Sequence, residues 1–404
     1  MTPLRYVWLA AATTVVLTCA GACDAGGAEP DDVIPATSPP SGVASPSSAT
    51  TPPASPTSSC VDQTLAELDL PGRVGQLLML GFDAGGSPDQ AIRLVTEHHL
   101  GSVTLIGRSY AGDGAVRALT DRLQAAADLP LFVGTDQEGG QVQVLHGPGF
   151  PEMPSAEEQG QLPVSRLERR SERWGDALAS AGVNLNLAPV LDVVPAALGA
   201  LNQPIGRYDR AYGSTPGGVT SHGLAFARGM SAAGVVPVVK HFPGLGAVRG
   251  NPDVRVNVVD ATTTPTSGAA APFRAAVAAG VPMVMVSSAR YARLDPNELA
   301  LFSEAIITGL LREELGFTGV VITDDVGAAA AVRAEAPVAE RAIRFLEAGG
   351  DLILTVQAAD VPTMVTALSE RAQRLPAFGA LVDASVQRVL TAKDAAGLLA
   401  CARA

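Results

Sequence analysis

Two adjacent carboxylates, Asp324 and Asp325, directly follow a short apolar run at residues 320–323. A run of β-branched apolar residues is typical of a strand buried on both faces, as in a parallel sheet. In α/β barrels the carboxyl ends of the strands carry the chemistry, so an acid at this position can act as a nucleophile or a proton donor. The alternative interpretation is an Asp pair that caps the next helix.

The elements that would position such acids are eight short apolar runs separated by amphipathic stretches. The runs are residues 76–80, 102–106, 131–135, 183–187, 236–239, 283–286, 320–323 and 352–354. The amphipathic stretches include residues 115–127, 166–181, 219–233, 269–279, 303–315 and 338–348. This alternation predicts an α/β fold, and eight strands predict a single (β/α)8 barrel closed by helices within residues 360–398. A doubly wound sheet is the alternative.

Composition excludes several classes of protein. The chain of 404 residues carries 28 basic and 40 acidic residues, a net charge of −12, which opposes nucleic-acid binding. A hydrophobic content of 47% with 17% charged residues excludes a chain that is disordered throughout. Histidine and cysteine are too sparse and scattered for a zinc site, and no Gly-x-Ser-x-Gly motif occurs. We therefore expect neither a metal nor a cofactor.

Residues 1–23 have the pattern of an export signal. Arg5 precedes an apolar run at residues 7–17 that is too short to span a membrane, and small residues lead to Cys23. The pattern resembles a lipoprotein signal, in which Cys23 would be lipidated and would anchor the protein to the outer face of the cytoplasmic membrane. Ala20 stands where such signals usually have Leu, and an ordinary secretory signal is the alternative.

Residues 24–59 are rich in Ser, Thr, Pro and Ala and cannot bury a core, so we interpret them as a tether before a folded domain at residues 60–404. After the signal and the lipidated cysteine, two cysteines remain, Cys60 and Cys401, one at each end of this domain. In an exported protein they are expected to form a disulfide. Two unpaired thiols are the alternative.

Five segments resemble motifs of bacterial family 3 glycoside hydrolases, in particular single-domain β-N-acetylhexosaminidases. They are residues 136–140 (DQEGG), 186–192 (NLAPVLD), 210–213 (RAYG), 240–244 (KHFPG) and 310–327 (LLREELGFTGVVITDDVG). The motifs occur in the family's order and extend over nearly all of residues 70–356. The resemblance implies a retaining β-glycoside hydrolase that acts on peptidoglycan-derived amino sugars of the cell wall, and the signal-like residues 1–23 predict that it is exported.

The resemblance also implies roles for single residues. Asp324 matches the family's nucleophile, which would form a covalent glycosyl-enzyme. Asp136 matches a residue that accepts hydrogen bonds from sugar hydroxyls, and Arg210, Lys240 and His241 match residues that donate to the sugar. Each also has a purely structural alternative, as a cap, an ion-pair partner or a satisfied core histidine.

The loop after the KHFPG motif departs from the family pattern. Asn251 and Asp253 stand where the family has an Asp and a His that together supply the acid/base. The histidines are at positions 98, 99, 146, 222 and 241, so none lies in this loop. We expect Asp253 to take the acid/base role on a mobile, glycine-rich loop, where shielding by Leu245 or Val254 would keep its carboxyl group protonated and Arg249 or Arg255 nearby would oppose this. The alternative is that Asp253 caps a turn.

Three further departures leave the sugar less well defined. Gln141 and Val144 stand where the family usually has Arg, and Ser288 stands where a His is common. Together with the altered loop, they motivate a second hypothesis, a catalytically impaired barrel that binds cell-wall saccharides.

Overall fold

The predicted barrel is confirmed in a computed structural model, which describes residues 59–399. Its main sheet contains eight strands in the cyclic order of the sequence, all paired in parallel. They are β1 (Leu78–Asp83), β2 (Ser102–Ile106), β3 (Phe132–Thr135), β6 (Leu185–Asn186), β7 (Val236–Phe242), β9 (Met283–Val286), β12 (Val320–Thr323) and β13 (Ile353–Thr355). A parallel bridge between Ile322 and Leu352 joins the two edges and closes the barrel.

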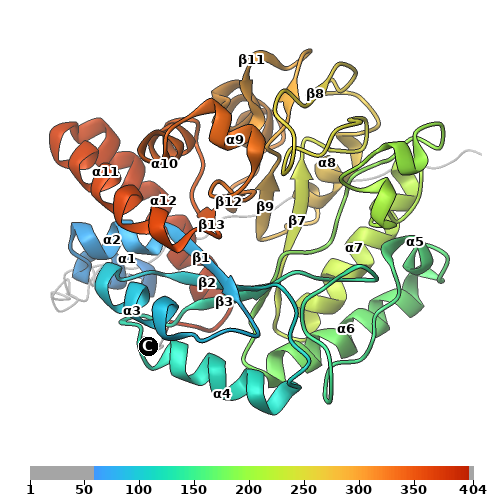
Figure 1. Cartoon of the computed structure of the whole chain (residues 1–404). Coiled ribbons are helices and arrows are strands. Elements are labelled where there is room, and N and C mark those ends of the chain that lie inside the picture. The colour runs from blue at the N-terminus through green and yellow to red at the C-terminus, as the bar shows by residue number, and fades with distance from the viewer. Residues whose placement is uncertain (1–58, 400–404) are drawn as a thin grey trace, which may run out of the picture. The chain divides into compact units, whose positions relative to one another are not determined.

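Helices surround these strands (Figure 1). They are α3 (Asp89–His98), α4 (Asp113–Gln124), α6 (Val164–Ser180), α7 (Pro216–Ala232), α8 (Ala271–Ala278), the π-helix η4 (Ala305–Glu314), α9 (Ala330–Glu335), α10 (Val338–Glu347), α11 (Val361–Arg374) and α12 (Pro376–Ala395). Each of the six predicted amphipathic stretches overlaps one of these helices over most of its length. In α6, for example, Leu167, Trp174 and Leu178 are buried while Arg166 and Arg173 are exposed, which is the pattern of a helix that packs on a sheet.

Two strand boundaries differ from prediction in ways that matter for the site. β7 continues three residues beyond the apolar run and carries Lys240 and His241 within the strand. The backbone N–H of Ser287, just after β9, donates to the carbonyl of Phe242 and holds this polar extension in the sheet. At the other end of the barrel Gln76 closes helix α2 (Leu70–Gln76) instead of opening β1.

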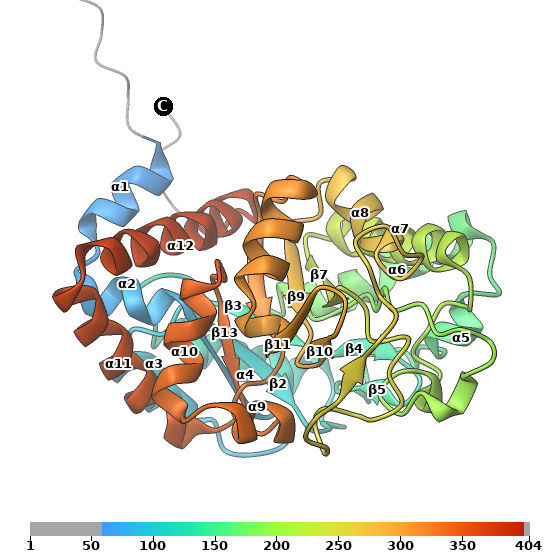
Figure 2. The same ribbon diagram turned by 90° about the horizontal axis from the view of Figure 1, so that it is seen from above.

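The two ends of the described chain lie together. Helix α1 (Cys60–Glu67) and α2 lie beside α11 and α12, as Figure 2 shows. Cys60 is disulfide-bonded, whereas Cys19, Cys23 and Cys401 lie outside the described residues, so its pairing with Cys401 stays a prediction. The expected signal at residues 1–23 and all of the tether except Ser59 also lie outside them. Within residues 59–399 no helix is long and apolar enough to cross a membrane.

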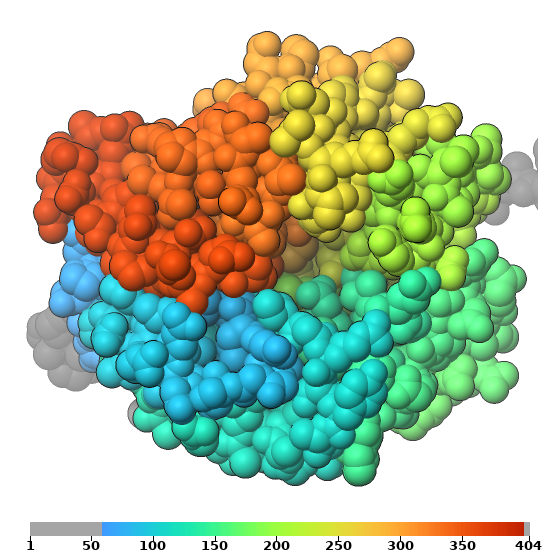
Figure 3. All heavy atoms as spheres, viewed as in Figure 1, coloured from blue at the N-terminus to red at the C-terminus, as the bar shows by residue number. Residues whose placement is uncertain are grey.

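Short helices and strands lie in the loops that follow the barrel strands. They are the hairpin β4 (Gln137–Gly139) and β5 (Val142–Gln143), helix α5 (Ala156–Gln159), the 3-10 turns η1 (Gly199–Leu201), η2 (Gly206–Tyr208), η3 (Ala300–Phe302) and η5 (Ala358–Asp360), and a small sheet of β8 (Val259–Asp260), β10 (Arg290–Tyr291) and β11 (Asp295–Leu299). The face seen in Figure 3 is hollowed near its centre, where orange, yellow, green and cyan segments meet. Distant parts of the sequence therefore share one depression.

Candidate active site

Asp324 stands at the carboxyl end of β12, as predicted, and is half-buried. One carboxylate oxygen accepts the backbone N–H of Asp325 at 2.9 Å, and the other accepts the hydroxyl of Ser288 at 3.4 Å. Burial, followed by the charge of Asp253, raises the pKa of Asp324 to about 6, although His241 opposes the shift. Asp324 is therefore an anion, and a potential nucleophile, above about pH 6.

Asp325 is tied to the backbone instead. Its two carboxylate oxygens accept the N–H groups of Gly327 at 2.9 Å, Ala328 at 2.8 Å and Val356 at 3.0 Å. Burial raises the pKa of Asp325, while these backbone donors oppose the shift. Asp325 therefore orders the turn after β12, and of the two adjacent acids Asp324 is the one left to react.

A buried ion network lies at the barrel mouth, with Lys240 in β7, Asp136 just after β3 and Glu138 in β4. The Lys240 ammonium lies 2.6 Å from a carboxylate oxygen of Asp136 and 2.6 Å from one of Glu138. Arg210 donates to both oxygens of Glu138, from Nε at 2.9 Å and from Nη2 at 2.8 Å. A two-point contact of this kind fixes the plane of the guanidinium as well as its position. The structure thus brings three of the sequence-predicted residues together around one that was not predicted.

The charges in this network favour one another. Burial alone would raise the pKa of Glu138, but Arg210 and Lys240 outweigh it and lower that pKa to about 2. Burial would likewise lower the pKa of Lys240, but Asp136 and Glu138 more than offset it and raise that pKa. Both groups are therefore charged at neutral pH, and the donors around Glu138 are set before any ligand arrives.

Glu138 is the functional residue that the motif comparison missed. Side chains two residues apart in extended backbone lie on the same face, so an acid at position 138 should point the same way as Asp136. That spacing was the signal that could have identified it. The side chain of Glu138 is only 3% exposed, whereas that of Asp136 is 28% exposed. Glu138 therefore organises the cations, and Asp136 keeps an accessible oxygen.

His241 is oriented by Asp192, which lies just beyond β6. Nδ1 of His241 lies 2.6 Å from one carboxylate oxygen of Asp192, and the other oxygen accepts the backbone N–H groups of His241 at 3.2 Å and Leu245 at 2.7 Å. A carboxylate can only accept, so Nδ1 carries the ring proton. Nε2 is then left as the ring atom that can meet a ligand; it accepts a hydrogen bond when the ring is neutral and donates one when the ring is protonated.

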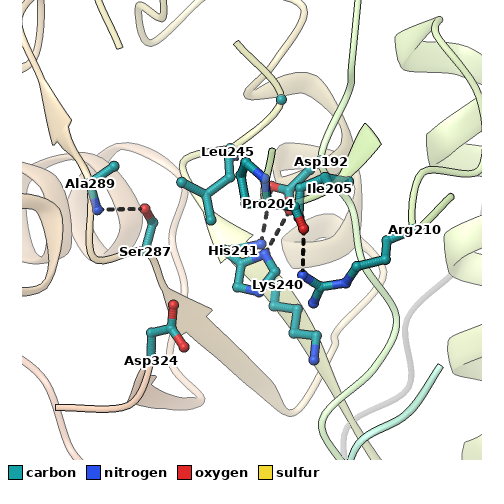
Figure 4. A network of polar contacts seen from close by, with 12 residues as sticks. Asp192, Pro204, Ile205, Arg210, Lys240, His241, Leu245, Ser287, Ala289 and Asp324 are labelled. Carbon is teal, nitrogen blue, oxygen red and sulfur yellow. Dashed lines mark hydrogen bonds and ion pairs between the residues drawn. The ribbon is translucent and has the colours of Figure 1, made fainter. Parts of the chain in front are cut away.

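Figure 4 shows how these groups lie: Asp324 is on one side, and His241, Lys240 and Arg210 are on the other. Such a set offers charged donors, a partly exposed carboxylate on Asp136 and a separate carboxylate, Asp324, that can act as a nucleophile. It suits a small ligand with many hydroxyl groups, because each hydroxyl can donate to one member and accept from another. Among the described residues, no group of three or more His, Cys, Asp or Glu side chains is arranged to hold a metal ion.

Asp253 lies on the loop between β7 and β8, and its surroundings differ from expectation. Its side chain is exposed, Val254 is 71% exposed, and Leu245 is buried in the core. The expectation that Leu245 or Val254 shields Asp253 is therefore wrong. The charge of Asp253 is nevertheless the second-largest cause of the raised pKa of Asp324, so the two carboxyl groups lie near each other.

The loop is also more firmly attached than its glycine content predicts. The carbonyl oxygens of Pro252 and Asp253 accept the backbone N–H groups of Ala331 and Ala330, at the start of α9. Asn251 accepts the backbone N–H of Asp253 at 3.0 Å through its side-chain oxygen. Asp253 thus rests against the start of α9, in the segment that follows β12.

At the three other positions that depart from the family pattern, this chain has no Arg or His side chain. Val144 is buried, and its backbone N–H donates to the carbonyl of Asp136. Gln141 is exposed, and its carbonyl accepts Nη2 of Arg108 at 2.9 Å. Ser288 binds Asp324 where the family pattern has a histidine.

Comparisons with known proteins agree with this geometry. A family model described as the glycosyl hydrolase family 3 N-terminal domain matches residues 69–392. The chain is 34% identical over 405 residues to the beta-hexosaminidase LpqI of Mycobacterium tuberculosis, with 97% of each chain covered. It is 34% identical over 318 residues to a beta-hexosaminidase of Xylella fastidiosa, covering 77% of this chain and 92% of the relative. The crystal structure of a beta-N-acetylhexosaminidase from Beutenbergia cavernae is similar with a TM-score of 0.80 and 46% identity, covering 81% of this chain and 99% of that one.

Proposed function

Because the chain belongs to glycosyl hydrolase family 3 and is a glycoside hydrolase, we propose that it is a retaining β-N-acetylhexosaminidase whose nucleophile is Asp324. The observation that carries the proposal is the position of Asp324. It is a half-buried carboxylate at a strand end, opposite a preset cluster of Lys240, His241 and Arg210. This arrangement can hold a sugar on one side and attack its anomeric carbon from the other.

In the first step Asp136, Lys240, Arg210 and His241 hold the hydroxyl groups of the terminal sugar. An oxygen of Asp324 attacks the anomeric carbon, the glycosidic C–O bond breaks, and Asp253 gives its proton to the departing oxygen. In the second step Asp253 takes a proton from water, the water oxygen attacks the same carbon, and Asp324 leaves. Two displacements at one carbon give net retention.

The assignment of Asp253 rests on its place on the loop and on its electrostatic effect on Asp324. The exposure of its side chain is the observation that favours a second candidate, a barrel that binds cell-wall saccharides but turns them over poorly. Without an acid, an enzyme still cleaves a dinitrophenyl glycoside, whose leaving group needs no proton, but fails on a sugar leaving group.

The sugar and its source are inferred from the relatives. The names of the matched proteins, beta-hexosaminidase and beta-N-acetylhexosaminidase, support an N-acetylhexosamine in the site. The predicted export signal supports a peptidoglycan-derived substrate outside the cytoplasmic membrane, with Cys23 as the lipid attachment site. Labelled fatty acid should be incorporated into the native chain and not into Cys23→Ser. Equal labelling of both would refute the anchor.

Two measurements test the catalytic proposal. A panel of nitrophenyl β-glycosides should give turnover with the N-acetylglucosaminide, whereas saccharide binding without turnover on any sugar would favour the second candidate. For Asp253→Ala, kcat/KM should fall by about 100-fold or more on the disaccharide and little on the dinitrophenyl glycoside. Azide should then accelerate the second step. Native rates on both substrates would show that the acid lies outside this loop.

A further inference from the structure

Asn202 is a fully buried amide between η1 and η2, in the segment that connects β6 to α7. Its Nδ2 group lies 2.8 Å from the carbonyl oxygen of Leu245, 3.1 Å from that of Gly246 and 2.8 Å from that of Val248. All three acceptors belong to the first half of the loop that carries Asp253. One side chain of a neighbouring loop therefore holds most of the backbone that leads to the proposed acid/base.

The other end of the amide organises the sugar-binding side. Oδ1 of Asn202 accepts the backbone N–H groups of Ile205 at 3.0 Å and Gly206 at 2.9 Å. Within the turn so formed, the carbonyl of Pro204 accepts Nη1 of Arg210 at 2.9 Å. The site therefore needs a side chain with donors at one end and an acceptor at the other, which Asn has and Asp lacks.

Further contacts show how closely the two loops meet. A Cβ atom on Gly246 would lie 1.8 Å from the carbonyl oxygen of Val193, so the two backbones are in direct contact. The backbone N–H of Gln203 donates to the carbonyl of Arg249 at 3.3 Å. Asn202 orients the contact between the two loops, because its Nδ2 group donates to the carbonyl oxygens of Leu245, Gly246 and Val248.

We propose that Asn202 is a positioning residue that sets where Asp253 stands relative to the bound sugar. This inference rests on the proposed acid/base role of Asp253. The loop is held at its start by Asn202 and at Asp253 itself by the backbone of α9. Loss of the amide donors removes three contacts from the first half of the loop, while the bonds of Leu245 to Asp192, of Gln203 to Arg249 and of Asp253 to α9 remain. The carboxyl group is therefore displaced without being removed.

The test is Asn202→Asp, which keeps the size of the side chain and its acceptor but turns an oxygen toward three carbonyl groups. An acid moved by about 1 Å costs on the order of 100-fold in rate. We expect kcat/KM on the N-acetylglucosamine disaccharide to fall by about 10- to 100-fold, and that on the dinitrophenyl N-acetylglucosaminide to fall by less than about threefold. Azide should restore part of the lost second step.

Asn184→Asp is the matched control. Asn184 also binds backbone at both ends of its amide: Oδ1 accepts the N–H of Val133 at 2.8 Å, and Nδ2 donates to the carbonyl of Leu131 at 2.9 Å. It does so at the start of β3 and β6, the end of the barrel away from the site. The same substitution there should lower stability and leave the ratio of the two kcat/KM values unchanged.

The double variant with Asp253→Ala separates this inference from the proposed function. If Asn202 acts through Asp253, Asn202→Asp adds no further selective loss once Asp253 is gone. A selective loss in Asp253→Ala with an equal loss on both substrates in Asn202→Asp would overturn the inference and leave the acid/base assignment intact. Native rates in Asp253→Ala with a selective loss in Asn202→Asp would overturn the assignment and show that Asn202 positions a different acid.

Should Asn202→Asp fail to fold, Asn202→Ser removes the Nδ2 donors without placing a charge among the three carbonyl groups. Hydrogen exchange then reports the attachment directly. In the native enzyme the amide of Leu245, which donates to Asp192, and that of Gln203, which donates to Arg249 across the two loops, should exchange slowly. In Asn202→Ser they should exchange at least about tenfold faster while those of β7 do not change. Unchanged exchange in this segment would refute the positioning role.

Discussion

The half-buried carboxylate of Asp324, the proposed nucleophile, should lower the free energy of unfolding at neutral pH. The pKa of Asp324 rises from 3.8 to about 6 on folding, chiefly because of burial and then because of the charge of Asp253. Between these two pH values the folded state binds more protons than the unfolded state, so stability falls as pH rises through this window. A shift of about 2 units corresponds to about 3 kcal/mol of stability that is present below pH 3.8 and absent above pH 6.

Asp324→Asn removes the titration and keeps an oxygen that can accept the N–H of Asp325. We therefore expect its free energy of unfolding at pH 7.5 to exceed that of the native enzyme by up to about 3 kcal/mol, with the difference shrinking as pH falls toward 4. Urea denaturation followed by circular dichroism across pH 4 to 8 measures it, while activity is lost at every pH.

Asp253→Asn is the companion variant. Asp253 is exposed, so its own removal has little direct effect on stability, but it should lower the pKa of Asp324 and recover part of the same gain. In the double variant the two gains should not add, because both act through one titrating group. A gain that does not depend on pH, or no gain in Asp324→Asn, would refute the reasoning.

The remaining predictions concern other buried groups. Glu138→Gln leaves Arg210 without its counter-charge, so the free energy of unfolding at pH 7 should fall by about 3 to 5 kcal/mol and KM should rise; a variant as stable as the native enzyme in urea denaturation contradicts this. Lys393, whose pKa burial lowers to about 7, should stabilise the fold when replaced by Met, with a gain in urea denaturation that is full below pH 7 and disappears as pH rises from 7 toward 10.5; a gain that persists there refutes the assignment. Non-reducing peptide mass spectrometry of exported protein should find Cys60 joined to Cys401, a link that contributes about 6 kcal/mol in the chain-entropy model, whereas two alkylatable thiols would contradict it.

The barrel could be predicted because its strands are buried on both faces. Such strands read as continuous apolar runs, and residues 102–106, 283–286 and 320–323 agree with β2, β9 and β12 to the residue. Prediction failed where polar residues continue a strand. Lys240 can lie in β7 because Asp136 and Glu138 neutralise it, and His241 because Asp192 orients it. A search for apolar runs does not detect such partners.

The site was predicted as a set of strand-end residues, and the ion pairs among them follow from the barrel. What the sequence could not supply was the contacts between loops. Asn202 carries no signal of its own, because its five backbone partners come from two segments about 40 residues apart. The same contacts turn Leu245 into the core and leave Val254 in solvent, which is why the expected shielding of Asp253 was wrong.

The most direct test of the account is to trap the glycosyl-enzyme. An activated 5-fluoro glycoside of N-acetylglucosamine should inactivate the enzyme by slowing the second displacement more than the first, leaving one sugar bound to protein. Digestion and fragment mass spectrometry should place that mass on Asp324. A label on Asp325, or on no carboxylate between residues 310 and 327, would contradict the assignment of Asp324 as the nucleophile.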